Sequence, residues 1–142
     1  MAELARQALL PYPNAAVYEL VNDVERYPEF VPGVAHVTVL SQSGTEVVAT
    51  VLAEARGFSE AFTTRNRLAS GERIELEMLE GPFSHLSGAW QFTALGEQGC
   101  KVELSLHYEI GGLLGRTLKP VMNRAADSVL EAFVTRARTV LV

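Results

Sequence analysis

The hydrophobic positions of residues 113–142 repeat with the period of an α-helix. One side of the helical wheel collects the apolar residues Leu114, Leu118, Val121, Met122, Ala125, Val129, Ala132, Phe133 and Val140. The opposite side collects the charged residues Arg116, Arg124, Asp127, Glu131 and Arg138. At about 1.5 Å per residue this helix would be about 45 Å long. A compact chain of this size has a diameter of roughly 35–40 Å. We therefore expect one helix that spans the molecule and buries its apolar side against a large surface.

Two residues qualify this prediction. Pro120 lies on the polar side of the helix, where an interior proline removes one hydrogen bond and bends the helix around the core. Alternatively, Pro120 begins the helix, and residues 113–119 form a separate turn. Arg136 lies on the apolar side near the end of the helix, where its long stem can bring the charge to water.

Six segments before this helix have the alternation of β-strands. They cover residues 35–41, 46–56, 58–69, 73–80, 86–94 and 101–110. In the fourth, Ile74, Leu76 and Met78 alternate with Glu75 and Glu77, so that one face is apolar and the other charged. Such closely spaced strands, joined by short turns, indicate an antiparallel meander with one face in water.

The first 31 residues predict a further strand and two short helices. Residues 3–11 read as a strand, residues 15–22 as a helix with Asn14 as its N-cap, and residues 24–31 as a second helical turn ended by prolines. We therefore expect an α+β fold in which residues 1–142 form one domain. A curved antiparallel sheet of about seven strands wraps around a long C-terminal helix, with two short helices after the first strand.

Composition places the chain among ordinary soluble proteins. Of its 142 residues, 48% are hydrophobic and 20% are charged. No apolar run approaches the roughly 20 residues of a membrane span, and the N-terminus has no signal-peptide pattern. The chain has a single cysteine, Cys100, which excludes an internal disulfide. We interpret Cys100 as a small structural residue at a turn. These features predict a cytoplasmic protein.

The net charge of −5 is unevenly distributed along the chain. Residues 1–112 carry a balance of −8, whereas residues 113–142 carry +3. The body should therefore repel nucleic acid and acidic membranes, and we expect no binding to DNA. The outer face of the helix could attract RNA or a membrane surface, although a solvated helix face explains the same charges.

No pattern in the chain predicts catalysis. The three histidines, His36, His85 and His107, lack metal-ligand spacing with each other or with Cys100, so we expect no metal site. Neither a nucleotide-binding glycine loop nor a Gly-x-Ser-x-Gly elbow is present. The acidic residues of segment 23–29 could lie at a cavity mouth, but acidic residues on an exposed turn are more often solvated.

Three regions together resemble a known family. They are LPY at 10–12 with VYELVNDVERYPEFVPG at 17–33, FTTRN at 62–66, and GPFSHLSGAWQF at 81–92. Their order is similar to that of the START-like, helix-grip family of bacterial proteins. The relevant branch includes the ribosome-association toxin RatA and the coenzyme Q-binding proteins. The resemblance covers nearly the whole chain.

The resemblance implies a non-enzymatic protein that needs no cofactor. Its ligand would be a polyisoprenoid quinone, such as ubiquinone, or a similar lipid that supports respiration. The ligand would occupy a cavity between the sheet and the long helix. The expected ligand-binding residues are Tyr27, Phe30, Phe62, Leu76, Met78, Trp90, Phe92, Leu106, Tyr108, Met122 and Val129. A solid core would use the same residues, and periodicity alone favours a solid core. In a cavity, Trp90 and Tyr108 could each offer a hydrogen bond to a quinone carbonyl.

Two further features each have two interpretations. The segment 27–32 contains two prolines, and it is either a tight structural turn or a gate that carries Tyr27 and Phe30 at the cavity mouth. Arg65 is either a charged group on the outer face of the sheet or a partner-binding residue. We favour the outer face, because alternation places Arg65 opposite Phe62 and Leu68.

Two other function classes stay open. The first alternative is a RatA-type toxin that binds the large ribosomal subunit and blocks subunit association, with Arg116, Arg124 and Arg138 as the partner-binding residues. The second is a polyketide-cyclase-like enzyme, against which the lack of an acid–base pair counts. A peripheral contact with the inner face of the plasma membrane would suit the lipid-binding hypothesis.

Overall fold

The computed structural model describes residues 2–55 and 58–141, with the side chains of 55, 58 and 112–119 left undescribed. Its strands are β1 (Ala2–Leu10), β2 (Val34–Gln42), β3 (Glu46–Ala55), β4 (Phe58–Ala69), β5 (Arg73–Glu80), β6 (His85–Ala94) and β7 (Cys100–Glu109). Its helices are α1 (Asn14–Asn22), the 3₁₀-helix η1 (Val24–Glu29) and α2 (Gly112–Val140). The predicted order of elements is confirmed.

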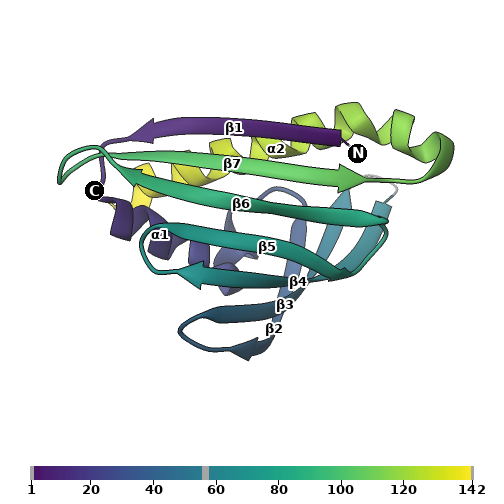
Figure 1. Ribbon diagram of the computed structural model, residues 1–142, viewed down its shortest axis with the longest axis horizontal. Coiled ribbons are helices and arrows are strands. Elements are labelled where there is room, and N and C mark those ends of the chain that lie inside the picture. The colour runs from purple at the N-terminus through teal and green to yellow at the C-terminus, as the bar shows by residue number, and fades with distance from the viewer. Residues whose placement is uncertain (1, 56–57, 142) are drawn as a thin grey trace.

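The seven strands form one antiparallel sheet in the order β1-β7-β6-β5-β4-β3-β2. The sheet bends between β7 and β2, and α1 and the long α2 lie on its inner side (Figure 1). Helix α1 contacts β6, β7 and α2, while α2 also contacts β1. This is the helix-grip architecture that the strand alternation and the C-terminal periodicity predict.

Helix α2 is continuous through Pro120, which confirms that this proline lies inside the helix. Its buried face differs from the predicted one. Among the described side chains of the helix, Ala126, Leu130, Phe133 and Ala137 are buried, whereas Val121 and Val140 are 44% and 48% exposed and Ala125 is exposed. At about 100° per residue, the helix is turned by about a quarter turn from the predicted orientation.

Packing explains this rotation. Ala126 and Ala137 have small side chains that let the helix approach the sheet closely, and Phe133 inserts into a group of aromatic rings. Hydrophobicity alone ranks valine above alanine. The helical wheel therefore predicted that Val121 and Val140 would be buried, although both are exposed. Both partners of a close contact determine which helix face is buried.

Polar contacts tie the first strand and the first helix to the rest of the fold. Arg6, on the edge strand β1, donates to the Asp127 carboxylate of α2 and, at 3.1 Å, to the Asn123 side-chain oxygen. Asn14 does not cap α1, as the sequence suggested. It is the first residue of the helix, and its side-chain amide donates to the Gly71 carbonyl at 2.9 Å. This bond joins the start of α1 to the turn between β4 and β5.

Candidate ligand site and basic helix face

The inner face of the sheet becomes less buried from one row of paired residues to the next. In the row Ile74–Trp90–Leu104, the residues are 2%, 6% and 4% exposed. The neighbouring row pairs Leu76 with Gly88 and Leu106, and both leucines are only half-buried. The interior therefore has a packed end and an end where inward-facing apolar side chains still reach solvent.

Phe133 of α2 is at the centre of the packed end. The centre of its ring lies 5.3 Å from the ring centre of Tyr27, 5.2 Å from that of Phe30 and 5.2 Å from that of Trp90. Each pair has an edge-to-face arrangement. Trp90 stacks on Phe92 at 6.5 Å, and the half-buried Val129 packs against the same cluster. Five of the expected ligand residues belong to this packed end: Tyr27, Phe30, Trp90, Phe92 and Val129. Leu76 and Leu106, from the neighbouring row, also pack against its buried cluster. The expected position of Trp90, on the inner face of the sheet beside the long helix, is confirmed.

The turn that carries Tyr27 and Phe30 is held firmly against α2. The Tyr27 hydroxyl donates to the Val21 carbonyl at the end of α1. The guanidinium of Arg136 lies 4.9 Å from the centre of the Phe30 ring and pairs with Glu29 at 2.9 Å. Arg136 is thus half-buried with its charge at the surface, as its position on the wheel suggested. These contacts give the turn a structural role at the packed end.

Burial predicts an alkaline effect of Tyr27 on stability. Desolvation, and then the charge of Asp23, raise the pKa of Tyr27 above its ordinary value of 10.0. The unfolded chain releases this proton first, so the contribution is complete below about pH 10 and is lost as pH rises further. Tyr27→Phe should lower stability at pH 7 by about 1 kcal/mol, because it removes the bond to Val21. Its free energy of unfolding should then fall less steeply than that of the wild type between about pH 9 and 11.

Urea denaturation across this pH range measures both effects. Tyr12→Phe serves as a control, because the Tyr12 hydroxyl has no hydrogen-bond partner within the described residues and lies outside the turn. Equal alkaline slopes for Tyr27→Phe and the wild type would contradict the assignment.

The half-buried end contains the other expected ligand residues. Phe62, Leu76, Met78, Leu106 and Met122 are all half-buried, although the strand residues face inward. The loop after β5 closes over two of them. A Cβ atom on Gly81 would lie 2.6 Å from the Met78 sulfur and 2.7 Å from the Phe62 Cβ. Only glycine therefore fits at this point.

Tyr108 is more buried than these neighbours. Its side chain is 3% exposed and packs with Leu4 and Ala126, while its ring lies 6.2 Å from that of Phe83. Met122 and Leu106 pack against this same cluster. Tyr108 thus forms one wall beside the half-buried end.

The sequence analysis missed two inward-facing polar residues on β4. Asn66 is paired with Val47 and Leu76, and Thr64 with Ala49 and Met78. Paired residues on antiparallel strands point to the same face, so both polar side chains point toward the helix side. The alternation Phe62-Thr64-Asn66-Leu68 was the signal that could have identified them.

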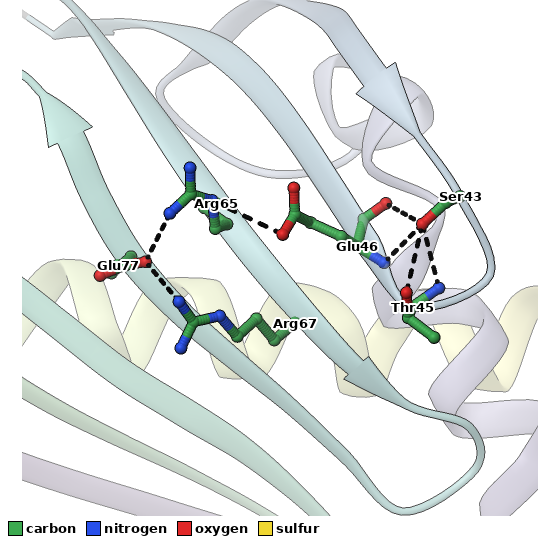
Figure 2. A network of polar contacts seen from close by, with 6 residues as sticks. All are labelled: Ser43, Thr45, Glu46, Arg65, Arg67 and Glu77. Atoms are coloured by element: carbon green, nitrogen blue, oxygen red, sulfur yellow. Dashed lines mark hydrogen bonds and ion pairs between the residues drawn. The ribbon is translucent and has the colours of Figure 1, made fainter.

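Arg65 lies on the outer face, as expected. Figure 2 shows its guanidinium between two carboxylates, with the Glu77 oxygen at 3.3 Å and the Glu46 oxygen at 3.6 Å. Arg67 shares Glu77 at 3.5 Å. The three strands β3, β4 and β5 are therefore linked by alternating charges on the side away from the helix.

The remaining candidate residues show no catalytic arrangement in the part of the chain that the structure describes. No group of three or more His, Cys, Asp or Glu residues is placed to hold a metal ion there. Asp23 and Glu29 are exposed and pair with Arg26 at 2.9 and 3.4 Å. Cys100 is the first residue of β7 and is fully buried, not at a turn. Burial raises the pKa of its thiol, which disfavours the reactive thiolate.

Two of the three arginines expected to bind a partner can be placed. Arg124 and Arg138 are exposed on α2, about 21 Å apart along the axis and on roughly the same side. Within the described residues, neither has an ion-pair partner, while Glu131 is exposed between them. Asp127 pairs with Arg6, so its charge is compensated. The Arg116 side chain lies outside the described residues.

No helix in the described part of the chain is both long enough and apolar enough to cross a membrane.

Comparison with known proteins gives both close and distant relatives. The ribosome association toxin RatA of Pseudomonas aeruginosa is 44% identical over 136 residues, covering 95% of this chain and 94% of that protein. RatA of Escherichia coli K12 is 36% identical over 141 residues, covering 99% and 89%. The persistence and stress-resistance toxin PasT of E. coli O6:H1 also has 36% identity, with the same coverage.

Solved structures share the fold at lower identity. The Zhui aromatase/cyclase from Streptomyces sp. R1128 superposes with a TM-score of 0.90 at 20% identity, covering 99% of this chain and 96% of that one. A START superfamily protein from Mycobacterium smegmatis has a TM-score of 0.85 at 17% identity, covering 96% and 97%. At these identities the likeness establishes the fold and says nothing of activity. Residues 10–134 match the family model described as polyketide cyclase / dehydrase and lipid transport, and the chain belongs to this START-like family.

Proposed function

We propose that this chain is a ribosome-associating protein of the RatA kind. The observation that carries the proposal is 44% identity along nearly the full length of a protein with that name. The same proposal includes contact with the large ribosomal subunit and interference with the association of the two subunits. The alternative function that the sequence analysis left open thus has more support than the quinone-binding function.

Charge indicates which surface would contact the ribosome. Residues 1–112 have a balance of −8, so most of the body would be repelled by RNA phosphates. The outer face of α2 offers Arg124 and Arg138, both exposed. Because Arg6 compensates Asp127, Glu131 is the acidic group that remains between them in the described part of this face.

This proposal predicts salt-sensitive binding to ribosomes. If two arginines each neutralise one phosphate, raising the salt from 50 to 200 mM should weaken binding about tenfold. Co-sedimentation of the purified protein with separated large and small subunits, over this range of salt, measures the effect. Absence of binding at low salt, or binding that salt does not change, would contradict the proposal.

A second function is supported by the burial of the inner face. We infer that the half-buried end of the interior binds an apolar molecule. Phe62, Leu76, Met78, Leu106 and Met122 all reach solvent there, whereas Trp90, Phe92 and Phe133 of the packed end are almost completely buried. Exposed apolar surface in a concave interior is the usual feature of a small-molecule site. The description of the matching family, which includes lipid transport, agrees with this interpretation.

The nature of the molecule is a further part of this proposal. A polyisoprenoid quinone such as ubiquinone would place its tail along Phe62, Met78 and Met122. Native mass spectrometry of the purified protein, followed by lipid extraction, would identify a ligand that copurifies. Recovery of an isoprenoid lipid in near-stoichiometric amount would support the quinone class.

A further inference from the structure

We propose that Asn66 and Thr64 form the polar end of the apolar ligand site, and that the ligand carries an uncharged oxygen group. This inference rests on the ligand-binding function proposed above. It adds a pair of hydrogen-bonding residues and a chemical class of ligand.

The strand register establishes where these two side chains point. Asn66 is opposite Val47, which is 2% exposed, and Thr64 is opposite Ala49, which is 3% exposed. Both partners belong to the buried core on the helix side of the sheet. On the other neighbouring strand, the partners of Asn66 and Thr64 are Leu76 and Met78 of the half-buried end.

Neither polar side chain has a hydrogen-bond partner among the described residues. The neighbouring Thr63, which points to the outer face, shares a 2.8 Å hydrogen bond with Thr50. By contrast, Asn66 and Thr64 are half-buried, and within the described residues no hydrogen bond reaches the Asn66 amide or the Thr64 hydroxyl, whose polar atoms still contact solvent. A partly desolvated polar group without a partner lowers stability. A ligand oxygen would supply the missing partner.

The charges nearby favour an uncharged ligand group. Arg6 is paired with Asp127, and Arg136 with Glu29. Arg65 and Arg67 lie on the outer face of the sheet with Glu77. Within the described residues, no unpaired cation faces Asn66 and Thr64, so a carboxylate or phosphate would be desolvated there without a counter-ion. An amide and a hydroxyl suit a carbonyl or an alcohol oxygen, to which both can donate.

The test compares two probes of equal chain length, 1-decanol and decanoate, at pH 8. Dissociation constants are measured by titration calorimetry for the wild type and three variants. Asn66→Leu and Thr64→Val remove the polar groups at nearly constant volume. Thr63→Val is the matched control, because it makes the same change one residue away on the opposite face.

The wild type should bind 1-decanol more tightly than decanoate. Asn66→Leu should weaken 1-decanol binding about five- to tenfold and raise the melting temperature of the ligand-free protein. Thr64→Val should weaken binding in the same direction, while Thr63→Val should leave the dissociation constant unchanged.

Three results would overturn the inference. If 1-decanol binds the wild type and neither Asn66→Leu nor Thr64→Val alters its affinity, the polar end is wrong while the apolar site stands. If decanoate binds more tightly, the uncharged class is wrong. If neither probe shows saturable binding to the wild type, both the proposed apolar site and its proposed polar end are contradicted.

Discussion

Replacing Phe133 with alanine is expected to lower the free energy of unfolding by about 3–5 kcal/mol. The ring is 3% exposed and contacts Tyr27, Phe30 and Trp90 at centroid distances of 5.2–5.3 Å. These partners come from η1, the loop after it, and β6. Since they are supported by different elements, they cannot all move together to fill the space. Urea denaturation followed by circular dichroism measures the loss.

A control on the same helix separates this packing effect from helix propensity. Val121 is 44% exposed, so Val121→Ala should change the free energy of unfolding by no more than about 0.5 kcal/mol. If Phe133→Ala cost no more than this control, the aromatic cluster would not be the contact that orients α2 on the sheet.

The second large effect concerns Met122, at the half-buried end. Met122→Trp should raise the melting temperature of the ligand-free protein, because the larger ring covers apolar surface that now reaches solvent. The same ring should block the site. An isoprenoid quinone at a hundred times its dissociation constant should stabilise the wild type by about 2.7 kcal/mol. That corresponds to a shift of several degrees for a domain of this size.

Thermal unfolding of both proteins, with and without the quinone, checks this prediction. The wild type should show the shift, and Met122→Trp should show almost none. If the half-buried end were a well-packed core, Met122→Trp would instead destabilise the protein by roughly 1–3 kcal/mol. That result, together with no response of the wild type to any quinone or lipid, would contradict the ligand-binding function.

The helices and strands of this fold could be predicted because one face of the sheet is exposed to solvent. Strand alternation is then clear in the sequence, as in β5, whose predicted and observed bounds coincide at Arg73–Glu80. Pro120 did not mislead the prediction of the long helix, because an exposed proline in a long amphipathic helix removes only a local hydrogen bond.

The rest depended on three-dimensional packing. The orientation of α2 is determined by Phe133 and by the small residues Ala126 and Ala137, which an apolar wheel undervalues. Burial divides the expected ligand residues between two ends of the interior, and periodicity cannot show that division. Asn66 was not among the expected ligand residues, which were all apolar or aromatic, while the register with Val47 and Leu76 places it on the inner face.

The most direct test of the proposed ribosome association is a comparison of two double charge reversals in binding to the large ribosomal subunit. Arg124→Glu with Arg138→Glu changes the outer face of α2. Arg67→Glu with Arg73→Glu makes the same change in net charge on the outer face of the sheet. Melting temperatures of both variants confirm that each is folded.

At low salt, the wild type and the sheet variant should bind the large subunit with similar affinity, whereas the α2 variant should bind at least about tenfold more weakly. Equal weakening by both variants would mean that net charge alone controls the interaction. Unimpaired binding of the α2 variant, or no binding of the wild type, would contradict the account of α2 as the ribosome-contacting surface.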